Sequence, residues 1–299
     1  SGASQISSIL FIIVIVLLTL EYLGRRSRKF HEKYSGASNT PTQTVSGFKN
    51  ISLFIICLIP LSLGFIIPVS ILLNFIIKGY SIINFYEISQ ITISSISLAF
   101  IASLLIMLLS LIMIVVGTYK SNNFQKILIF FASSGYAFPG TILAVGIVVF
   151  VGWLNDLIYF RMSYAVGGFI ILLFAYSIRF LAVGNGAITS GISRIHPNLL
   201  DASRTMGVSF FKSIRKIILP LLYTNLLVGG ILVFVDILKE LPITLLLRPF
   251  NFETLATYVY QYASDEMLEE SSFAALIIVI AGLGPVIFLN RTINKSIKN

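Results

Sequence analysis

Length, composition and charge exclude a soluble protein. The chain has 299 residues, of which 57% are hydrophobic and 11% are charged, with a formal net charge of +9. About a quarter of a soluble domain is charged, so this chain has too few charged side chains to cover a water-facing surface. One cysteine and two histidines exclude an internal disulfide and a Cys/His metal cluster. The composition predicts a polytopic membrane protein, and the scattered basic residues do not indicate nucleic-acid binding.

Seven apolar runs are long enough to cross a bilayer as helices, since about 20 residues suffice. They lie near residues 6–23, 51–77, 92–117, 127–152, 164–186, 222–246 and 273–290. Their continuous apolar character lacks the polar/apolar alternation of a membrane β-barrel. The predicted fold class is therefore an all-α, polytopic membrane helix bundle of about seven transmembrane helices.

The segments between these runs alternate in charge. One set is rich in Lys and Arg and includes residues 25–49, 194–216 and 291–298, whereas the other set holds most of the acids. Because basic loops stay in the cytoplasm, we expect a multi-pass protein with a cytoplasmic C-terminus.

The first run differs from a signal peptide, because its basic cluster follows the apolar stretch instead of preceding it. We interpret residues 1–50 as the last helix of a preceding repeat plus a basic cytoplasmic linker. Residues 51–299 then form a six-helix repeat. The alternative is a seven-helix protein with a processed start.

The long cytoplasmic segment, residues 187–221, has the pattern of two short helices joined by a turn. Pro197 suits the first turn of a helix, Gly207 suits the end of that helix, and Ser209 can cap the next one. Pro220 then starts or kinks the following span. The pattern predicts a helix–turn–helix at the cytoplasmic membrane surface, attached to a spanning helix. A protein that pushed on the first short helix would move the bundle.

This segment resembles the loop of binding-protein-dependent ABC importer permeases, whose pattern is E-A-A-x-x-x-G-x9-I-x-L-P. The matching positions, with Arg204 inside the segment, are Asp201, Ala202, Ser203, Gly207, Ile217, Leu219 and Pro220. Asp replaces Glu, and Ser replaces the second Ala. The resemblance covers about residues 92–290, and it implies the type I importer permease fold with a coupling helix that docks on a cytoplasmic ATPase. An amphipathic surface helix without a partner is the alternative.

The resemblance also implies the partners and the location. They are a cytoplasmic ABC ATPase dimer, a second permease repeat or subunit, a periplasmic solute-binding protein and the lipid of a bacterial inner membrane. ATP and Mg would bind to the ATPase, because this chain has no G-x-x-x-x-G-K-[ST] motif. We expect no cofactor, no metal site and no catalytic residues on this chain, which is therefore not expected to be an enzyme.

A second stretch, residues 234–266, resembles the permeases of ferric-iron importers, which are often two fused permease repeats. The resemblance implies uptake of ferric iron by ATPase-coupled alternating access. Permeases for thiamine, polyamines or phosphonates share the coupling loop, so these solutes remain open.

Four charged residues and one proline lie within predicted spans: Arg179, Asp236, Lys239, Glu240 and Pro242. A charge at the membrane centre costs at least about 2.5–3.5 kcal/mol, so these groups should face a polar cavity or a partner. They either line or gate the translocation path, or form ion pairs that hold helices together. An ion-coupled secondary transporter would use Asp236 and Glu240 as cation sites. A receptor or scaffold without transport is a further alternative.

Overall fold

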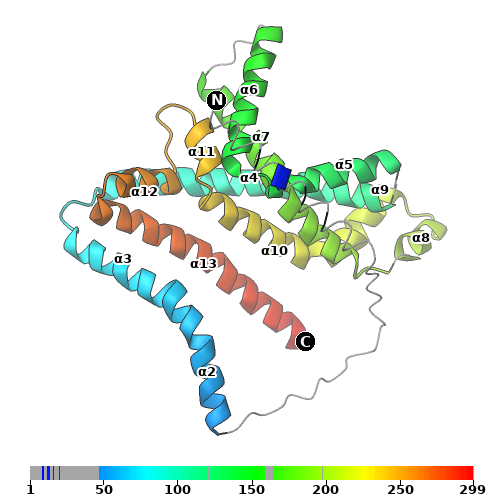
Figure 1. Ribbon diagram of the computed structural model, residues 1–299. Coiled ribbons are helices and arrows are strands. Elements are labelled where there is room, and N and C mark those ends of the chain that lie inside the picture. Colours follow the sequence, from blue (N-terminus) through cyan, green and yellow to red (C-terminus); the bar gives the residue numbers. More distant parts are fainter. Residues whose placement is uncertain are drawn as a thin grey trace. The chain divides into compact units, whose positions relative to one another are not determined.

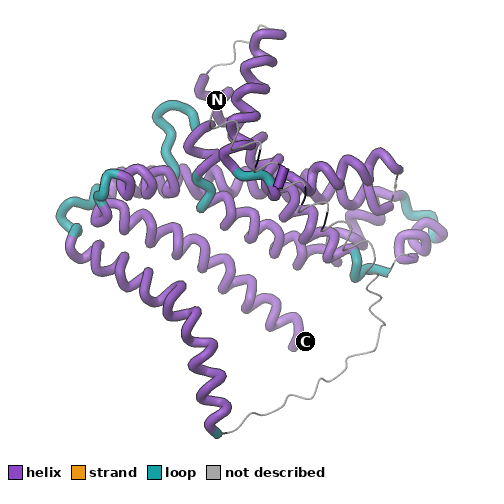
Figure 2. The backbone as a smooth tube through the Cα atoms, viewed as in Figure 1, coloured by secondary structure: helices purple, strands orange, loops and turns teal. Residues whose placement is uncertain are grey.

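The computed structural model describes residues 9, 12, 13, 16, 20, 47–119, 122–158, 164–196 and 198–298. Helices joined by short loops make up this part of the chain, which contains no strand (Figures 1 and 2). The predicted all-α fold is therefore confirmed. The chain forms two compact units, Ser1–Ser81 and Ile82–Asn299.

In the first unit, α2 (Phe48–Leu61) and α3 (Ile67–Lys78) continue into each other through one π-helical turn, Ser62–Ile66. Pro60 and Pro68 lie on either side of this turn. Each proline lacks the N–H that an α-helix uses for its i→i−4 hydrogen bond, which favours the longer hydrogen-bond spacing of a π-helical turn. The result is one apolar span, Asn50–Lys78, where the sequence predicts 51–77.

Three long helices form the centre of the second unit: α4 (Phe85–Tyr119), α7 (Tyr164–Ile192) and α10 (Leu219–Leu238). They pack pairwise against one another. Their contact faces bury large side chains such as Ile106, Tyr176 and Leu222. Glycines at the crossings allow the backbones to approach closely, as is usual between membrane helices.

Two adjacent glycines of α10 differ in surroundings and provide a matched test. A Cβ at Gly229 would lie 2.7 Å from Ala187 Cβ, whereas a Cβ at Gly230 would meet Met107 Cγ at 3.8 Å. Both changes to alanine gain the same helix propensity. We therefore expect Gly229→Ala to lower the free energy of unfolding by about 1–3 kcal/mol relative to Gly230→Ala, because only the former overpacks the crossing. Thermal unfolding of both purified variants measures the difference, and equal unfolding temperatures would contradict the packing.

The C-terminal part consists of α12 (Leu255–Ser264) and α13 (Leu268–Lys298), which pack against each other. Thr254 caps α12 together with Thr257. In addition, the Leu255 N–H donates to Ser95 Oγ of α4 at 2.7 Å. This bond ties the start of α12 to the central helices.

The run predicted at 127–152 is not one straight helix, which corrects the sequence-based expectation. It forms α5 (Asn123–Ser134), a 3-10 turn (Gly135–Ala137) and α6 (Gly140–Ile158), with a bend of 119° between the two parts. Pro139 cannot donate a hydrogen bond, and it favours an extended conformation at the preceding residue. Phe138 has that conformation, with φ −78° and ψ 135°.

The run predicted at 222–246 is likewise broken. Helix α10 ends at Leu238, and a separate short helix, α11, spans Pro242–Leu247. Pro242 ends the first helix because it has no N–H to donate to the carbonyl of Leu238.

The described residues contain five helices that are long and apolar enough to cross a membrane, or up to six if the bent pair counts as one span. The first run, predicted at 6–23, lies mostly outside the described residues. The boundary at residue 50 between two repeats also remains a prediction.

Candidate functional site

The loop that carries the permease-like pattern forms two short helices between α7 and α10. Helix α8 spans Asn198–Thr205, and α9 spans Phe210–Ser213. A π-helical segment, Ile214–Ile218, then leads without a break into α10. The predicted helix–turn–helix is therefore present, and its second part is continuous with a spanning helix. Pro197 and the side chains of Asp201 and Arg204 lie outside the described part of the chain.

The turn after α8 requires glycine. Gly207 has φ +77°, and the Val208 N–H donates to the Ser203 carbonyl at 3.1 Å. This bond and the left-handed glycine together form the Schellman ending of a helix. A Cβ at Gly207 would meet no described atom within 4 Å. The backbone conformation, rather than crowding within the chain, therefore selects glycine here.

Ser203 stands where the family pattern has its second alanine, and its contacts explain why a serine is accepted at this position. Its side chain is buried, and its hydroxyl lies 2.7 Å from that of Ser213, which is also buried. The Ser213 hydroxyl in turn donates to the Ser209 carbonyl at 3.1 Å. The hydroxyl pair fixes α8 against α9. Ser209 occupies the predicted N-cap position of α9, but its side chain makes no capping hydrogen bond.

The two sides of this loop differ. Met206 and Phe211 are 74% and 80% exposed, and Ala202 is also exposed. On the inner side, Ile218 and Leu222 are fully buried. Among the other pattern positions, Ile217 and Leu219 are half-buried, and Pro220 is exposed near the start of α10. The loop therefore presents exposed apolar side chains, together with the exposed basic residues Lys212, Arg215 and Lys216, on an element anchored in the bundle.

The charged residues of the predicted spans form two ion pairs. Arg179 of α7 lies with its Nε 3.5 Å from Glu240 Oε2, and the two side chains are 18% and 7% exposed. Lys239 Nζ lies 2.8 Å from Asp236 Oδ1, with 62% and 17% exposed. The sequence leaves two roles open for these residues, and the contacts observed between them are ion pairs. The role in a translocation path stays a prediction.

Glu240 also organises the start of α11. Its Oε1 accepts a hydrogen bond from the Ile243 N–H at 3.3 Å, and its carbonyl accepts one from Thr244 Oγ1 at 2.7 Å. The Thr244 hydroxyl pairs with the buried Tyr176 hydroxyl of α7 at 2.5 Å. The break before Pro242 is thus a hydrogen-bonded junction and not a simple kink.

Sequence reasoning missed the partners that the other helix break supplies. Arg179 Nη1 donates to the Phe138 carbonyl at 3.2 Å. A Cβ at Gly140 would lie 2.7 Å from Arg179 Nη1 and 2.9 Å from Glu240 Oε1. The Phe-Pro-Gly sequence at 138–140 indicates a helix break. It does not indicate that this break contacts Glu240.

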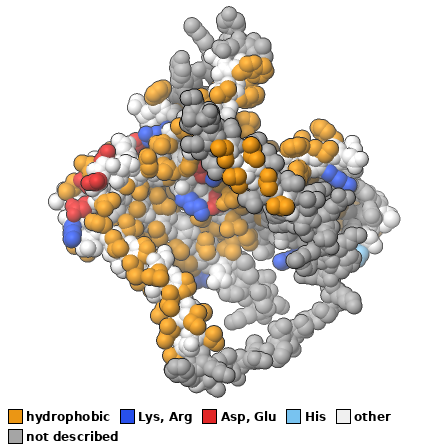
Figure 3. Space-filling model, in the orientation of Figure 1, with side chains coloured by type: hydrophobic (Ala, Val, Ile, Leu, Met, Phe, Trp, Pro, Cys, Tyr) orange, Lys and Arg blue, Asp and Glu red, His pale blue; other side chains and the backbone are white. Residues whose placement is uncertain are grey.

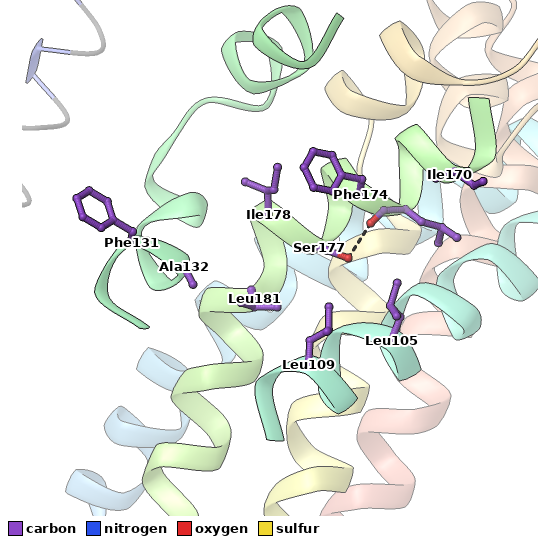
Figure 4. Close-up of a pocket in the computed structure, with 10 residues that line it drawn as sticks. Leu105, Leu109, Phe131, Ala132, Ile170, Phe174, Ser177, Ile178 and Leu181 are labelled. Carbon is purple, nitrogen blue, oxygen red and sulfur yellow. Dashed lines mark hydrogen bonds between the residues drawn. The ribbon is translucent and has the colours of Figure 1, made fainter. Parts of the chain in front are cut away.

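An apolar cavity of about 450 Å³ lies between α4, α5 and α7 (Figure 4). Of its ten lining residues, which include Leu105, Phe131 and Phe174, only Ser177 carries a polar side chain. That hydroxyl donates to the Leu173 carbonyl of its own helix at 2.7 Å. The cavity offers a polar solute no free group to bind.

The surface is consistent with a lipid environment. In the view of Figure 3, hydrophobic side chains cover most of the described surface, and charged side chains gather in a few separate places. Many large apolar residues of the spans, such as Phe54, Phe100 and Phe288, are more than half exposed. Such a surface is stable only in lipid or against another protein.

Three comparisons identify the family and its fold. Residues 113–299, more than half of the chain, match the family model described as "Binding-protein-dependent transport system inner membrane component". The chain is 23% identical, over 97% of its length, to the Fe(3+)-transport system permease protein FbpB 2 of Haemophilus influenzae, of which it covers 57%. It is 28% identical, over 57% of its length, to the maltose/maltodextrin permease protein MalG of Photorhabdus laumondii, of which it covers 55%.

A solved structure has a similar fold. It is a chain of a bacterial ABC transporter involved in the import of the acidic polysaccharide alginate, with a TM-score of 0.62 and 14% identity. The likeness covers 83% of this chain and 95% of that one. The chain spans little more than half the length of the curated relatives that it matches. With its apolar spans, this multi-pass membrane protein belongs to the family of binding-protein-dependent transport system inner membrane components.

Proposed function

We propose that the chain is the permease part of an ATP-driven importer, moved by a separate cytoplasmic ATPase that docks on residues 201–207. The observation that carries this proposal is the exposed turn at Gly207, next to Met206 and Phe211, on a loop continuous with α10. A movement of α8 would be transmitted to that spanning helix through the Ser203–Ser213 contact. ATP and Mg belong to the ATPase in this scheme.

The coupling loop lies in the cytoplasm in this scheme, and so does the C-terminus. The basic residues Lys212, Arg215 and Lys216 follow the turn and are exposed. Basic residues at the ends of spanning helices favour the cytoplasmic side of the inner membrane. A periplasmic binding protein would deliver the solute to the opposite face. A second permease repeat or subunit would complete the path, with Asp236, Lys239 and Glu240 near it.

Ferric iron is the solute that we propose. Support comes from the Fe(3+)-transport permease, which aligns with 97% of this chain. Thiamine, a polyamine or a phosphonate are the alternatives, and the maltose/maltodextrin and alginate relatives show how varied the solutes of such folds are.

Uptake by the complete transporter tests this proposal. The full-length gene product would be co-purified with its ATPase and placed in proteoliposomes with the cognate binding protein. We expect uptake of radiolabelled ferric iron that requires Mg-ATP on the ATPase side, and no uptake with ADP. Uptake driven by a proton or sodium gradient without ATP would support a secondary transporter instead. ATP-driven uptake of thiamine, polyamine or phosphonate, but not iron, would overturn the solute assignment alone.

A further inference from the structure

Two helix breaks that are distant in the sequence meet at one side chain. The break between α5 and α6 supplies the Phe138 carbonyl and Gly140, and the break between α10 and α11 supplies Glu240. Arg179 of α7 contacts both. Helix α11 also packs against α6 and α7.

We infer that Arg179 is a positioning residue that pins the two breaks together, so that α6, α7 and α11 move as one body. The neighbouring Asp236–Lys239 pair makes no such link between separate elements. The pin itself follows from the geometry, whereas its part in uptake rests on the proposed function.

Arginine is suited to this position because it uses different nitrogens for the two breaks. Nη1 donates to the Phe138 carbonyl, and Nε lies 3.5 Å from the Glu240 carboxylate as an ion-pair contact, without a hydrogen bond to any described atom. A lysine carries one nitrogen on a flexible stem and lacks the planar, branched arrangement of donors. Low exposure at Arg179 and Glu240 shields this pair from water, which strengthens the attraction between the charges.

Gly140 completes the pin by being without a side chain. Any Cβ there would press against both Arg179 Nη1 and Glu240 Oε1, as well as Pro242 Cβ at 3.2 Å. Gly146 lies on the same helix, and a Cβ there would meet nothing within 4 Å in the described part of the chain. The two glycines therefore form a matched pair of test positions.

The second ion pair has a different geometry. Asp236 and Lys239 are three residues apart at the end of one helix, so their contact ties no two elements together. Lys239 is 62% exposed. Lys239 directly follows the spanning helix, which ends at Leu238, and its exposed cation requires water, a polar cavity or a protein partner, which fits a group beside the solute path.

A thiol reporter tests the pin without a partner protein, and an uptake assay tests its part in transport. Cys57 is the one cysteine of the chain, so the double variant Cys57→Ser, Ala144→Cys has a single thiol within these 299 residues and serves as the parent. Ala144 is fully buried and lies one helical turn after Gly140. We expect Gly140→Ala to raise the rate of maleimide labelling at position 144 at least tenfold and to lower ATP-driven uptake at least tenfold. Gly146→Ala should change neither, and Arg179→Lys should behave as Gly140→Ala does.

Lys239→Ala separates the two pairs. We expect it to lower uptake while position 144 stays protected from maleimide. Slow labelling and normal uptake in both Gly140→Ala and Arg179→Lys would overturn the pin. Fast labelling in Lys239→Ala would overturn the division of roles. If Gly140→Ala does not accumulate in the membrane, the labelling rate and the uptake of Arg179→Lys test the pin instead. Absence of ATP-driven uptake in the unmodified transporter would instead count against the proposed function, whereas the labelling needs no partner protein and still tests the pin.

Discussion

Replacing Gly207 with valine is expected to abolish ATP-driven uptake and ATPase co-purification while the membrane bundle stays folded. Gly207 has φ +77°, a conformation that costs a residue with a Cβ about 1–2 kcal/mol and a β-branched residue more. The Val208–Ser203 bond that closes α8 depends on this conformation. Loss of the turn would redirect α8, together with the neighbouring Met206. Uptake into proteoliposomes and the amount of co-purified ATPase measure the effect, which we expect to exceed tenfold.

Two variants serve as controls for this prediction. Gly186 of α7 also has open space around a built Cβ, among the residues described, and it has no positive φ. Gly186→Val should therefore leave ATPase binding unchanged. Gly207→Asn should retain more activity than Gly207→Val, because asparagine tolerates the left-handed region. If asparagine and valine are equally inactive, the partner excludes any side chain at this position. If both are fully active, the coupling assignment is wrong.

Replacing Glu240 with alanine is expected to destabilise the bundle strongly. It leaves the guanidinium of Arg179, which is only 18% exposed, without its counter-ion and removes the acceptor of the Ile243 N–H. Breaking a buried pair in this way costs about 3–5 kcal/mol, because the remaining charge is uncompensated. Thermal unfolding of the purified protein in detergent measures the loss.

The exposed pair provides the comparison for Glu240→Ala. Lys239→Ala removes a side chain that is 62% exposed from a contact within one helix. Exposed pairs of this kind contribute about 0–1 kcal/mol. Glu240→Gln should fall between the two, because its amide oxygen can still accept from Ile243. Equal unfolding temperatures for Glu240→Ala and Lys239→Ala would show that burial of the Arg179–Glu240 pair has no energetic weight.

The two broken runs show where reading a sequence for membrane spans fails. Hydropathy averages over a window, so the apolar residues on both sides of Pro139 and of Pro242 appear as single runs. The chain instead bends by 119° at the first site and begins a new short helix at the second. Each proline removes one backbone donor, and this effect is invisible to an average over side chains.

The amino-acid sequence by itself determined the all-α membrane class, the position of most spans and the turn at Gly207. These features depend on residues that are close together in the chain: continuous apolar runs, or a helix followed by a glycine. Only the tertiary structure decided which charges pair and why Gly140 has no side chain. Arg179, Glu240 and the Phe138 carbonyl come from three separate segments, and their contact depends on how two helix breaks and α7 pack together. That packing arises from the summed contacts of the whole bundle and not from any local pattern.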